Sequence, residues 1–409
     1  MAAGAFWRLR ALPMGAYLSA PETSKESESG TMRDGFAYGC SSMQGWRRGQ
    51  EDAHLIADLP AGTELFAVFD GHGGREVSNF AKRHLTAALA EQPTFQTDLS
   101  ESLVASFHRI DEMLEDKANL PEVRALKKNA RDKEGSGAAA DAEDVEAADD
   151  DGERKVSMSE AVDLFQKLVM QKKQAGGGGD AGGAAGAAAG VANAAGAAPS
   201  RASAPSSSVV SRVGPGGQRM CTLPPSHIDA GATAVVAAMR GSMLYVANAG
   251  DSRAVISRRG KALPLSTDHK PALKSESQRI AKAGGFVTAQ GRINGNLNLS
   301  RALGDLKYKG DTSIGRHAQI ITAQPDITVH SIEKGDEFVV LACDGVWDCM
   351  TNQQVVDFIR ERIRNTPLSE ICEAILDSCI ADDPKTTGGI GGDNMTIVLV
   401  QLHPRAVPS

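Results

Sequence analysis

Hydrophobic positions along the chain form short continuous runs and helical stripes, separated by turns rich in glycine and polar residues. Strand-like apolar runs occur at 64–69, 233–239, 243–247, 253–256, 338–343 and 396–402. Apolar residues at helical spacing predict helices at 75–90, 99–114, 271–283, 353–363 and 368–380. Because strands and helices come in blocks rather than in strict alternation, the pattern favours an α+β fold over a doubly wound sheet.

The pattern is lost in the middle of the chain. Residues 141–153 include eight acidic residues and no basic one, and residues 175–219 are almost entirely Ala, Gly, Ser and Pro. Such a stretch cannot bury enough apolar area to offset its chain entropy, although 159–173 carries one helix-like stripe. We interpret 116–226 as a mostly disordered insertion in one domain, with a linker between two domains as the alternative. The acidic run is interpreted as solvated, with a docking role as the alternative.

These changes in pattern divide the 409-residue chain into five parts. The predicted parts are an N-terminal tail at 1–34, a first folded part at 35–115, the insertion at 116–226, a second folded part at 227–402 and a C-terminal tail at 403–409. The two folded parts are expected to form a single domain, because the entropy of closing a loop rises only slowly with its length.

Composition narrows the class of protein. Hydrophobic residues make up 41% of the chain, enough for a packed core, and the net charge of −7 argues against a nucleic-acid-binding protein, which usually carries a basic face. The six cysteines include no CxxC pair, so we expect reduced thiols and no zinc knuckle. No apolar run approaches the roughly 18 residues of a membrane span. We expect a cytoplasmic monomer, with a nuclear or membrane-associated location as alternatives.

The N-terminal sequence raises the question of acylation. Met14-Gly15-Ala16-Tyr17-Leu18-Ser19 fits the N-myristoylation pattern if Met14 is the true initiator, and a chance match is the alternative. Residues 1–13 would then lie upstream of the start; otherwise they are a weak targeting segment or a tail. A single acyl chain on Gly15 gives only weak membrane association.

Acidic residues recur beside glycine or in short turns. The turns are Glu51-Asp52, Asp70-Gly71, Gly250-Asp251-Ser252, Gly304-Asp305, Asp344-Gly345 and Gly392-Asp393-Asn394. Each alone is an ordinary turn sequence. Asp70 and Asp344, however, both end apolar strands, a position that projects a carboxylate from a rigid element into a cleft.

Converging carboxylates repel one another and raise each other's pKa values unless a cation is bound. Oxygen-only ligands without a His/Cys cluster favour Mg²⁺ or Mn²⁺ over Zn²⁺. Two such ions that share a carboxylate can activate a bridging water as a nucleophile. The sequence therefore predicts a hydrolytic metal centre.

Two further residues offer chemistry that metal ions do not supply. Arg47 has a planar guanidinium suited to phosphate oxygens. His72, two residues after Asp70, is a candidate proton donor for an alkoxide leaving group, with a purely structural histidine as the alternative. His54, two residues after Asp52, either orients a ligand or is structural.

Eight ordered segments resemble the PP2C-type family of metal-dependent protein serine/threonine phosphatases. They are Ser41-Ser42-Met43-Gln44-Gly45-Trp46-Arg47 with Gln50-Glu51-Asp52-Ala53-His54, Phe69-Asp70-Gly71-His72-Gly73-Gly74, Gly231-Ala232-Thr233-Ala234, Asn248-Ala249-Gly250-Asp251-Ser252-Arg253, Asp268-His269-Lys270-Pro271, Leu299-Ser300-Arg301-Ala302-Leu303-Gly304-Asp305, Leu341-Ala342-Cys343-Asp344-Gly345-Val346-Trp347-Asp348 and Gly392-Asp393-Asn394-Met395-Thr396. The resemblance covers about 35–115 and 227–402.

The resemblance implies an αββα sandwich, in which two stacked antiparallel β-sheets are flanked by helices and a dimetal cleft lies at one edge. It implies hydrolysis of phosphoserine and phosphothreonine proteins by a water or hydroxide activated on two Mg²⁺ or Mn²⁺ ions, without a phosphoenzyme. A weaker third ion is an open alternative. A Met-Gly start like Met14-Gly15 also looks like that of myristoylated members of the family.

The resemblance also implies roles for individual residues. Asp70 would bridge the two ions, and the rest of the core site would be the Gly71 carbonyl, Asp344, Asp393 and, directly or through water, Glu51 or Asp52. Asp251 and Asp305 would serve the third ion or the outer shell. Arg47 would hold the phosphate and His72 would be the general acid.

Departures from the family pattern are few. Arg48-Gly49 replaces the usual residues before the Gln50-Glu51-Asp52 turn with the spacing intact, and Ala272 stands where an acidic residue or Asn is common. The 116–226 insertion is larger than in compact members. Two rival hypotheses remain: a binding module that recruits partners through this insertion, and a metal-dependent hydrolase of small phosphoesters.

Overall fold

The computed structural model describes residues 17–127, 211–213, 219–221 and 228–402. The described residues all belong to one compact unit. The predicted acidic run, the helix-like stripe at 159–173 and the Met14-Gly15 start lie outside the described residues. Acylation of Gly15 therefore stays a prediction.

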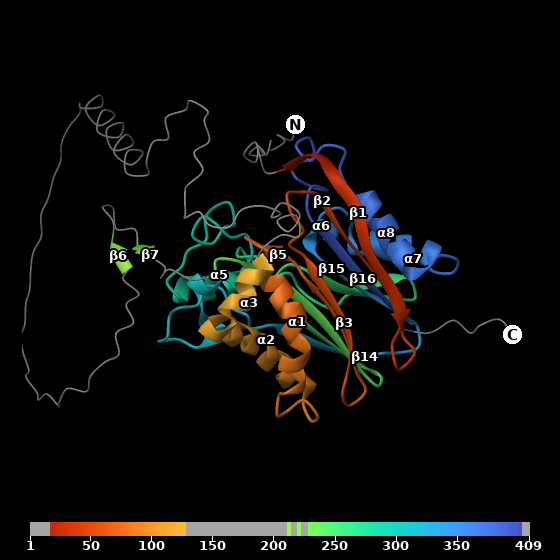
Figure 1. Cartoon of the computed structure of the whole chain (residues 1–409), viewed down its shortest axis with the longest axis horizontal. Helices are drawn as coiled ribbons and strands as arrows, with labels where there is room; N and C mark the ends of the chain where they lie inside the picture. Colours follow the sequence, from red (N-terminus) through yellow and green to blue (C-terminus); the bar gives the residue numbers. More distant parts are fainter. Residues whose placement is uncertain (1–16, 128–210, 214–218, 222–227, 403–409) are drawn as a thin grey trace, which may run out of the picture. The chain divides into compact units, whose positions relative to one another are not determined.

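Two antiparallel sheets stack face to face (Figure 1). The six-stranded sheet has the order β1 (Tyr17–Thr31), β2 (Ala37–Arg47), β16 (Met395–Gln401), β15 (Asp336–Ala342), β11 (Arg253–Arg258) and β12 (Lys261–Pro264). The five-stranded sheet has the order β14 (Asp326–Ser331), β10 (Met243–Ala249), β9 (Ala234–Arg240), β4 (Thr63–Phe69) and β3 (Ala53–Leu59). Each sheet contains strands from both predicted folded parts, so the two parts contribute to the same sandwich.

The core between the sheets explains why the central strands are apolar without interruption. In β15, Val339 and Leu341 face the opposite sheet, whereas Phe338 and Val340 face the helices on the outer side. Because both faces of a central strand are buried, alternation between polar and apolar residues disappears. The predicted strands at 64–69 and 338–343 are confirmed as β4 and β15.

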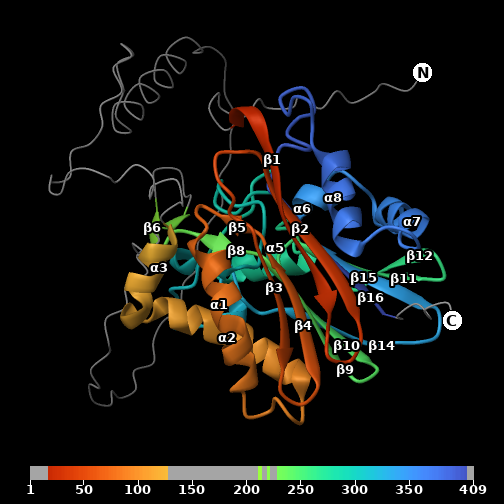
Figure 2. The same cartoon turned by 45° about the vertical axis from the view of Figure 1, so that its right-hand side comes forward.

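Helices cover the outer face of each sheet (Figure 2). On the five-stranded sheet lie α1 (Glu76–Ala90), α2 (Leu99–Glu115) and α3 (Leu120–Lys127). On the six-stranded sheet lie α7 (Asn352–Arg362) and α8 (Leu368–Cys379). The four layers confirm the predicted αββα sandwich. Among the described residues, no helix has the length and apolar character needed to cross a membrane.

Smaller elements surround one end of the sandwich. α5 (Lys274–Lys282), η3 (Leu306–Tyr308) and η4 (Arg316–Ala318) border a separate small core that includes Ile280 and Tyr308. A three-stranded sheet joins β13 (Leu303–Gly304), β8 (Gly231–Ala232) and β5 (Gly71–His72), and α6 spans Asp344–Trp347. The pair β6 (Ser211–Val213) and β7 (Arg219–Cys221) forms a further sheet, and η1 spans Lys117–Asn119.

The predicted N-terminal tail at 1–34 requires correction, because residues Tyr17–Thr31 form strand β1. Its sequence is polar and its burial pattern is irregular, so it carries no hydrophobic alternation. β1 is an edge strand, held by backbone hydrogen bonds to β2, with register shifts on either side of Glu22 that accommodate Pro21. Backbone pairing of this kind leaves little trace in the side-chain pattern.

Two other predicted boundaries shift. The insertion was predicted to begin at 116, but α3 continues the fold to Lys127 and buries Val123 against the five-stranded sheet's helical layer. The helix predicted at 271–283 begins at Lys274, because Leu273 is extended and forms its N-cap. The remaining predicted helices agree with the structure to within one or two residues.

A buried ion pair near the start of β15 gives a test of the fold. Asp336 is fully buried and accepts hydrogen bonds from Arg258 Nε at 2.6 Å and from the Glu333 N–H at 2.9 Å. Burial alone would raise the pKa of Asp336, but these bonds and the one with His330 lower it to about 2.

We expect Asp336→Ala to lower the free energy of unfolding at neutral pH by about 3–5 kcal/mol, because it leaves Arg258 without its buried partner. Urea denaturation measures the loss. Glu361→Ala is the matched control, because the side chain of Glu361 is 72% exposed and forms a surface pair with its neighbour Arg362. The control should change stability by less than about 0.5 kcal/mol, and equal losses in both variants would contradict the prediction.

Candidate metal centre

Four predicted carboxylates flank strands at one end of the sandwich. Asp52 precedes β3 and Asp70 follows β4, and these strands are neighbours whose pairing joins Ala53 to Phe69. In the other sheet Asp344 follows β15, and Asp393 lies two residues before β16. Adjacent antiparallel strands run in opposite directions, so the end of one strand meets the start of the next. Both sheets therefore deliver carboxylates to the same place.

Asp52 lies at the centre of this group. Its Oδ2 accepts a hydrogen bond from the Thr396 hydroxyl at 2.8 Å, whereas its buried Oδ1 has no partner among the described residues. Ligand atoms of Asp52, Asp70 and Cys343 lie within 4.8 Å of one another. Burial, with the charge of Asp393, raises the pKa of Asp52 to about 7.

Asp70 and Asp344 show the same electrostatic conflict more strongly. Burial raises the pKa of Asp70 well above its usual value, and the charges of Asp52 and Asp344 raise it further. Burial and the charges of Asp251 and Asp393 likewise raise the pKa of Asp344. A divalent cation among these oxygens would remove the repulsion, and an all-carboxylate donor set suits a hard cation. The residues therefore fit the predicted Mg²⁺ or Mn²⁺ centre.

The loop at Gly71 comes very close to Glu51. A Cβ atom at Gly71 would lie 2.3 Å from the Glu51 carbonyl oxygen, so no larger residue fits without moving the backbone. The Ser78 hydroxyl of α1 also donates to that carbonyl. Thr233 fixes the Asp70 backbone, because its N–H donates to the Asp70 carbonyl at 2.8 Å. The close approach keeps Asp52 and Asp70 together.

Asn394 joins the Glu51 segment to the other sheet. Its Oδ1 accepts from the Glu51 N–H at 2.9 Å, and its Nδ2 donates to the carbonyls of Gln44 and Gly49. Its own N–H donates to Asp393 Oδ1 at 2.8 Å. Asn394 thus connects two acidic turns that are more than 300 residues apart in sequence.

Arg47 lies at the outer edge of the centre. Its guanidinium donates from Nη2 to Asp393 Oδ2 at 2.6 Å, and the two side chains are 47% and 36% exposed. One nitrogen of the planar fork is held, and the side chain keeps a solvent-facing surface. This geometry suits contact with an anionic group that approaches from solvent.

His72 and Asp305 meet across a glycine in the small three-stranded sheet. Gly231 pairs with His72 on one side and with Gly304 on the other. His72 Nε2 lies 2.7 Å from Asp305 Oδ2, and a Cβ at Gly231 would collide with both side chains. Burial lowers the pKa of His72, but the charge of Asp305 and its hydrogen bond raise it more, so the net shift is upward.

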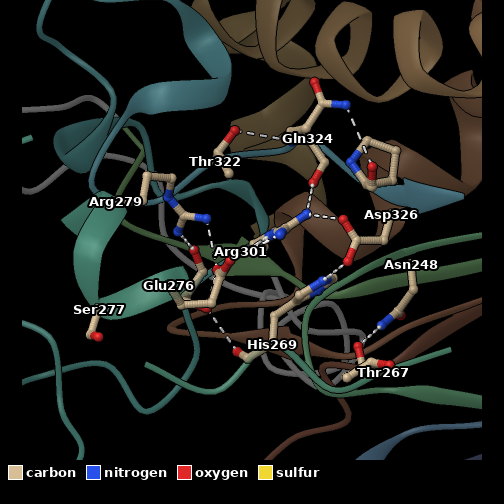
Figure 3. Close-up of polar contacts among 12 residues, drawn as sticks. Asn248, Thr267, His269, Glu276, Ser277, Arg279, Arg301, Thr322, Gln324 and Asp326 are labelled. Atoms are coloured by element: carbon tan, nitrogen blue, oxygen red, sulfur yellow. Dashed lines mark hydrogen bonds and ion pairs between the residues drawn. The ribbon is translucent and has the colours of Figure 1, made fainter. Parts of the chain in front are cut away.

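Asp251 pairs with Lys270. A polar network that includes His269, Arg301 and Asp326 lies next to this pair in sequence and is drawn in Figure 3. His269 Nδ1 accepts from the Gly250 N–H at 3.2 Å, and its Nε2 lies 3.0 Å from Asp326 Oδ2. Because Nδ1 accepts, Nε2 carries the proton and donates to Asp326. Arg301 extends the network by pairing with Asp326 at 2.7 Å.

At its far end the network reaches α5 through Glu276, which is buried. Arg301 and Arg279 both pair with the Glu276 carboxylate, at 2.9 and 2.7 Å. Each charge in the chain from Glu276 to Asp326 therefore has a partner of opposite sign. The network fixes the backbone at Gly250, and with it the direction of the Asp251 side chain.

The structure therefore brings all the predicted site residues into one neighbourhood. It adds contacts that sequence reasoning did not assign, which are made by Thr233, Lys270, Asn394 and Thr396. Asp348 also interacts electrostatically with this group, and burial raises its pKa. Their only sequence signal was membership of the quoted motifs. Asp305, predicted for a third ion or the outer shell, is the hydrogen-bond partner of His72.

Comparisons with known proteins agree with this geometry. The family model described as protein phosphatase 2C matches residues 36–141 and 217–387. Probable protein phosphatase 2C 60 of Arabidopsis thaliana is 39% identical over 95% of this chain and 92% of its own length. Probable protein phosphatase 2C 11 of Oryza sativa subsp. japonica is 40% identical over 95% of this chain and 91% of its own length.

The fold is also found among solved structures. A phosphatase from a pathogenic strain of Toxoplasma gondii superposes with a TM-score of 0.57 at 20% identity, over 94% of this chain and 98% of that one. The chain belongs to the protein phosphatase 2C family, whose members are metal-dependent serine/threonine protein phosphatases.

The electrostatic conflict at Asp70 makes a prediction for the metal-free protein. A carboxyl whose pKa is raised on folding binds more protons in the folded state, so the stability it contributes falls as the pH rises above its unfolded pKa. We expect Asp70→Asn to raise the melting temperature of the chelator-treated protein at pH 7.5 by roughly 2–4 °C, the shift that about 1 kcal/mol gives in a large domain.

The same variant should lose the stabilisation that Mn²⁺ gives to the unmodified protein. Differential scanning calorimetry with chelator and with Mn²⁺ measures both effects, and the gain without metal should shrink at pH 5. An Asp70→Asn protein that melts earlier without metal, yet is stabilised by Mn²⁺ as the parent is, would contradict this account.

Proposed function

We propose that this chain hydrolyses phosphoserine and phosphothreonine in proteins by direct transfer of the phosphoryl group to water at two Mg²⁺ or Mn²⁺ ions, without a phosphoenzyme. The observation that carries the proposal is the convergence of Asp52, which is buried, with Asp70 and Asp344, which are half-buried, in an arrangement whose mutual repulsion a cation would relieve. When bound, such ions polarise phosphoryl oxygens and make water a stronger nucleophile near neutral pH.

The absence of a covalent intermediate is supported by the state of the Cys343 thiol, which lies beside the carboxylates. Cys343 is fully buried, accepts a hydrogen bond from the Thr396 N–H at 3.2 Å and contacts the Asn394 carbonyl. Burial and the charges of Asp52 and Asp70 raise its pKa well above the usual value, which keeps the thiol protonated. A protonated thiol enclosed in this way is a poor nucleophile.

Each carboxylate has its own proposed role as a ligand of the ions. Asp70 is the proposed bridge, because it interacts with Asp52, Asp344 and Asp393 together. The Gly71 carbonyl, Asp344 and Asp393 are the proposed further ligands, with Glu51 or Asp52 acting directly or through water. Asp251 already has the Lys270 ammonium as its partner, so a third ion there would have to share it.

Arg47 and His72 act on the substrate. The exposed face of the Arg47 guanidinium would bind phosphate oxygens, with Asp393 fixing its orientation. His72 uses Nε2 to bond Asp305, and its Nδ1 has no hydrogen-bond partner among the described residues. The upward pKa shift keeps the ring protonated to a higher pH, so that Nδ1–H can donate to the departing seryl or threonyl oxygen.

Metal dependence is the direct test of the proposed function. With a phosphothreonine peptide, activity should fall to background in excess chelator and return when Mn²⁺ or Mg²⁺ is restored, because the carboxylates alone offer no electrophile. Asp344→Asn is the control and should remain folded yet regain little activity with metal. Turnover that survives chelation would refute the metal mechanism.

The general-acid role of His72 predicts a difference between substrates. His72→Ala should reduce kcat for a phosphopeptide by about 100-fold or more, because the alkoxide leaving group needs a proton. A nitrophenyl phosphate, whose leaving group is stable as an anion, should be affected by less than about tenfold. Steady-state assays of both substrates measure the ratio.

His84→Ala is the matched control for His72→Ala. His84 also pairs with a carboxylate, that of Glu122 at 3.0 Å, but on the surface between α1 and α3. It should leave both activities within about twofold of the parent. Equal losses on the two substrates in His72→Ala would exclude proton donation by this residue.

A further inference from the structure

A second group of metal-ligating side chains lies at the open edge between the two sheets. It consists of Glu28 on β1, Cys40 on β2 and His54 on β3, with ligand atoms that all lie within 4.8 Å of one another. Glu28 and Cys40 are direct partners in the ladder between β1 and β2. His54 reaches them from the other sheet, and its Nε2 is 3.6 Å from Glu28 Oε1. Figure 2 shows the three strands along this edge.

The solvent exposure of the three side chains decreases from Glu28 through His54 to Cys40. The Glu28 side chain is 52% exposed and that of His54 12%, whereas Cys40 is completely buried among apolar residues. An ion could enter past Glu28 and would end beside the sulfur. His54 and Glu28 form an ion pair whose 3.6 Å separation is longer than a good hydrogen bond.

The donor set differs in kind from that of the catalytic carboxylates. A thiolate sulfur, an imidazole nitrogen and one carboxylate oxygen are ligands that zinc binds tetrahedrally, with water in the fourth position. Mg²⁺ prefers oxygen ligands and has little affinity for such a set. One thiolate and one carboxylate together carry the two negative charges that neutralise a divalent cation.

We propose that Glu28, Cys40 and His54 form a second metal site, which binds Zn²⁺ or another borderline divalent cation and is separate from the catalytic centre. Binding forms a metal–sulfur bond and transfers the Cys40 thiol proton to water. Before binding, burial and the charge of Glu28 raise the pKa of the Cys40 thiol to about 12, so the free thiol is unreactive. The exposed Lys82 of α1 lies close enough to lower that pKa slightly.

The site would join the two sheets beside the catalytic centre. His54 on β3 lies two residues beyond Asp52, which directly precedes that strand, and Cys40 lies two residues before Ser42 on β2. Ser42 Oγ is 2.9 Å from the Thr396 hydroxyl, which in turn donates to Asp52. A cation bound by Cys40 and His54 would therefore link β2 to β3, the strands that position Asp52.

Cobalt provides a spectroscopic test that does not depend on catalysis. The full chain, stripped of metal and held in excess Mg²⁺ to fill the carboxylate centre, is titrated with Co²⁺. We expect a thiolate-to-cobalt charge-transfer band in the near ultraviolet that saturates at one equivalent. Added Zn²⁺ should remove the band, whereas added Mn²⁺ should not.

Variants identify which thiol is responsible. Cys40→Ser should abolish the band, and Glu28→Gln, at an exposed position that cannot disturb the core, should weaken cobalt binding by about tenfold or more. Cys343→Ser tests the thiol beside Asp52 and Asp70, and Cys372→Ala tests a buried thiol that contacts β2 at Gly39. Both of these variants should keep the band.

Three results would overturn the proposal. They are no charge-transfer band in the unmodified protein, a band that survives Cys40→Ser, and a band that disappears with Cys343→Ser instead. If Cys40→Ser does not fold, an unchanged cobalt affinity in the folded Glu28→Gln protein has the same meaning. None of these results bears on the phosphatase activity, which the metal-dependent peptide assay tests separately.

Discussion

The repulsion among converging carboxylates is the constraint on which the rest of the structure depends. Asp52 is buried and Asp70 and Asp344 are half-buried, and each has a raised pKa because burial and the neighbouring carboxylates oppose its ionised form. Only a rigid frame can hold such groups together, and the apolar core between the two sheets provides it. Each carboxylate is attached at or near the end of a strand, so core packing sets the distances at the centre.

The protein provides its own cations for the outer carboxylates but none for the inner ones. Arg47 pairs with Asp393, Lys270 with Asp251, and His72 with Asp305. Among the described residues, no basic side chain forms an ion pair with Asp52, Asp70 or Asp344. This division explains how the fold can hold many acidic groups at one end of the sandwich and remain stable. It also leaves the inner positions to divalent ions.

The sequence predicted the metal centre from carboxylates at the ends of apolar strands. It did not reveal the residues that hold those carboxylates in place. Asp70 and Asp344 could be identified because an apolar run stops at each of them. Asn394 and Thr233 could not, because they act through hydrogen bonds to backbone far away in sequence, which leave no local pattern. β1 was missed for a similar reason, since an edge strand needs only backbone pairing. The acid role of His72 came from family resemblance and not from its spacing.

The order in which the strands occur along the chain has a consequence for synthesis. β4, which directly precedes Asp70, pairs with β9, whose residues come more than 160 positions later, and Asp393 comes later still. A ribosome adds about 5–20 residues per second. The interval between Asp70 and Asp393 is therefore on the order of 15–65 seconds at that rate. During translation the nascent chain carries the first half of the centre well before the second half exists, so phosphatase activity must begin only as the last strand joins the sheet.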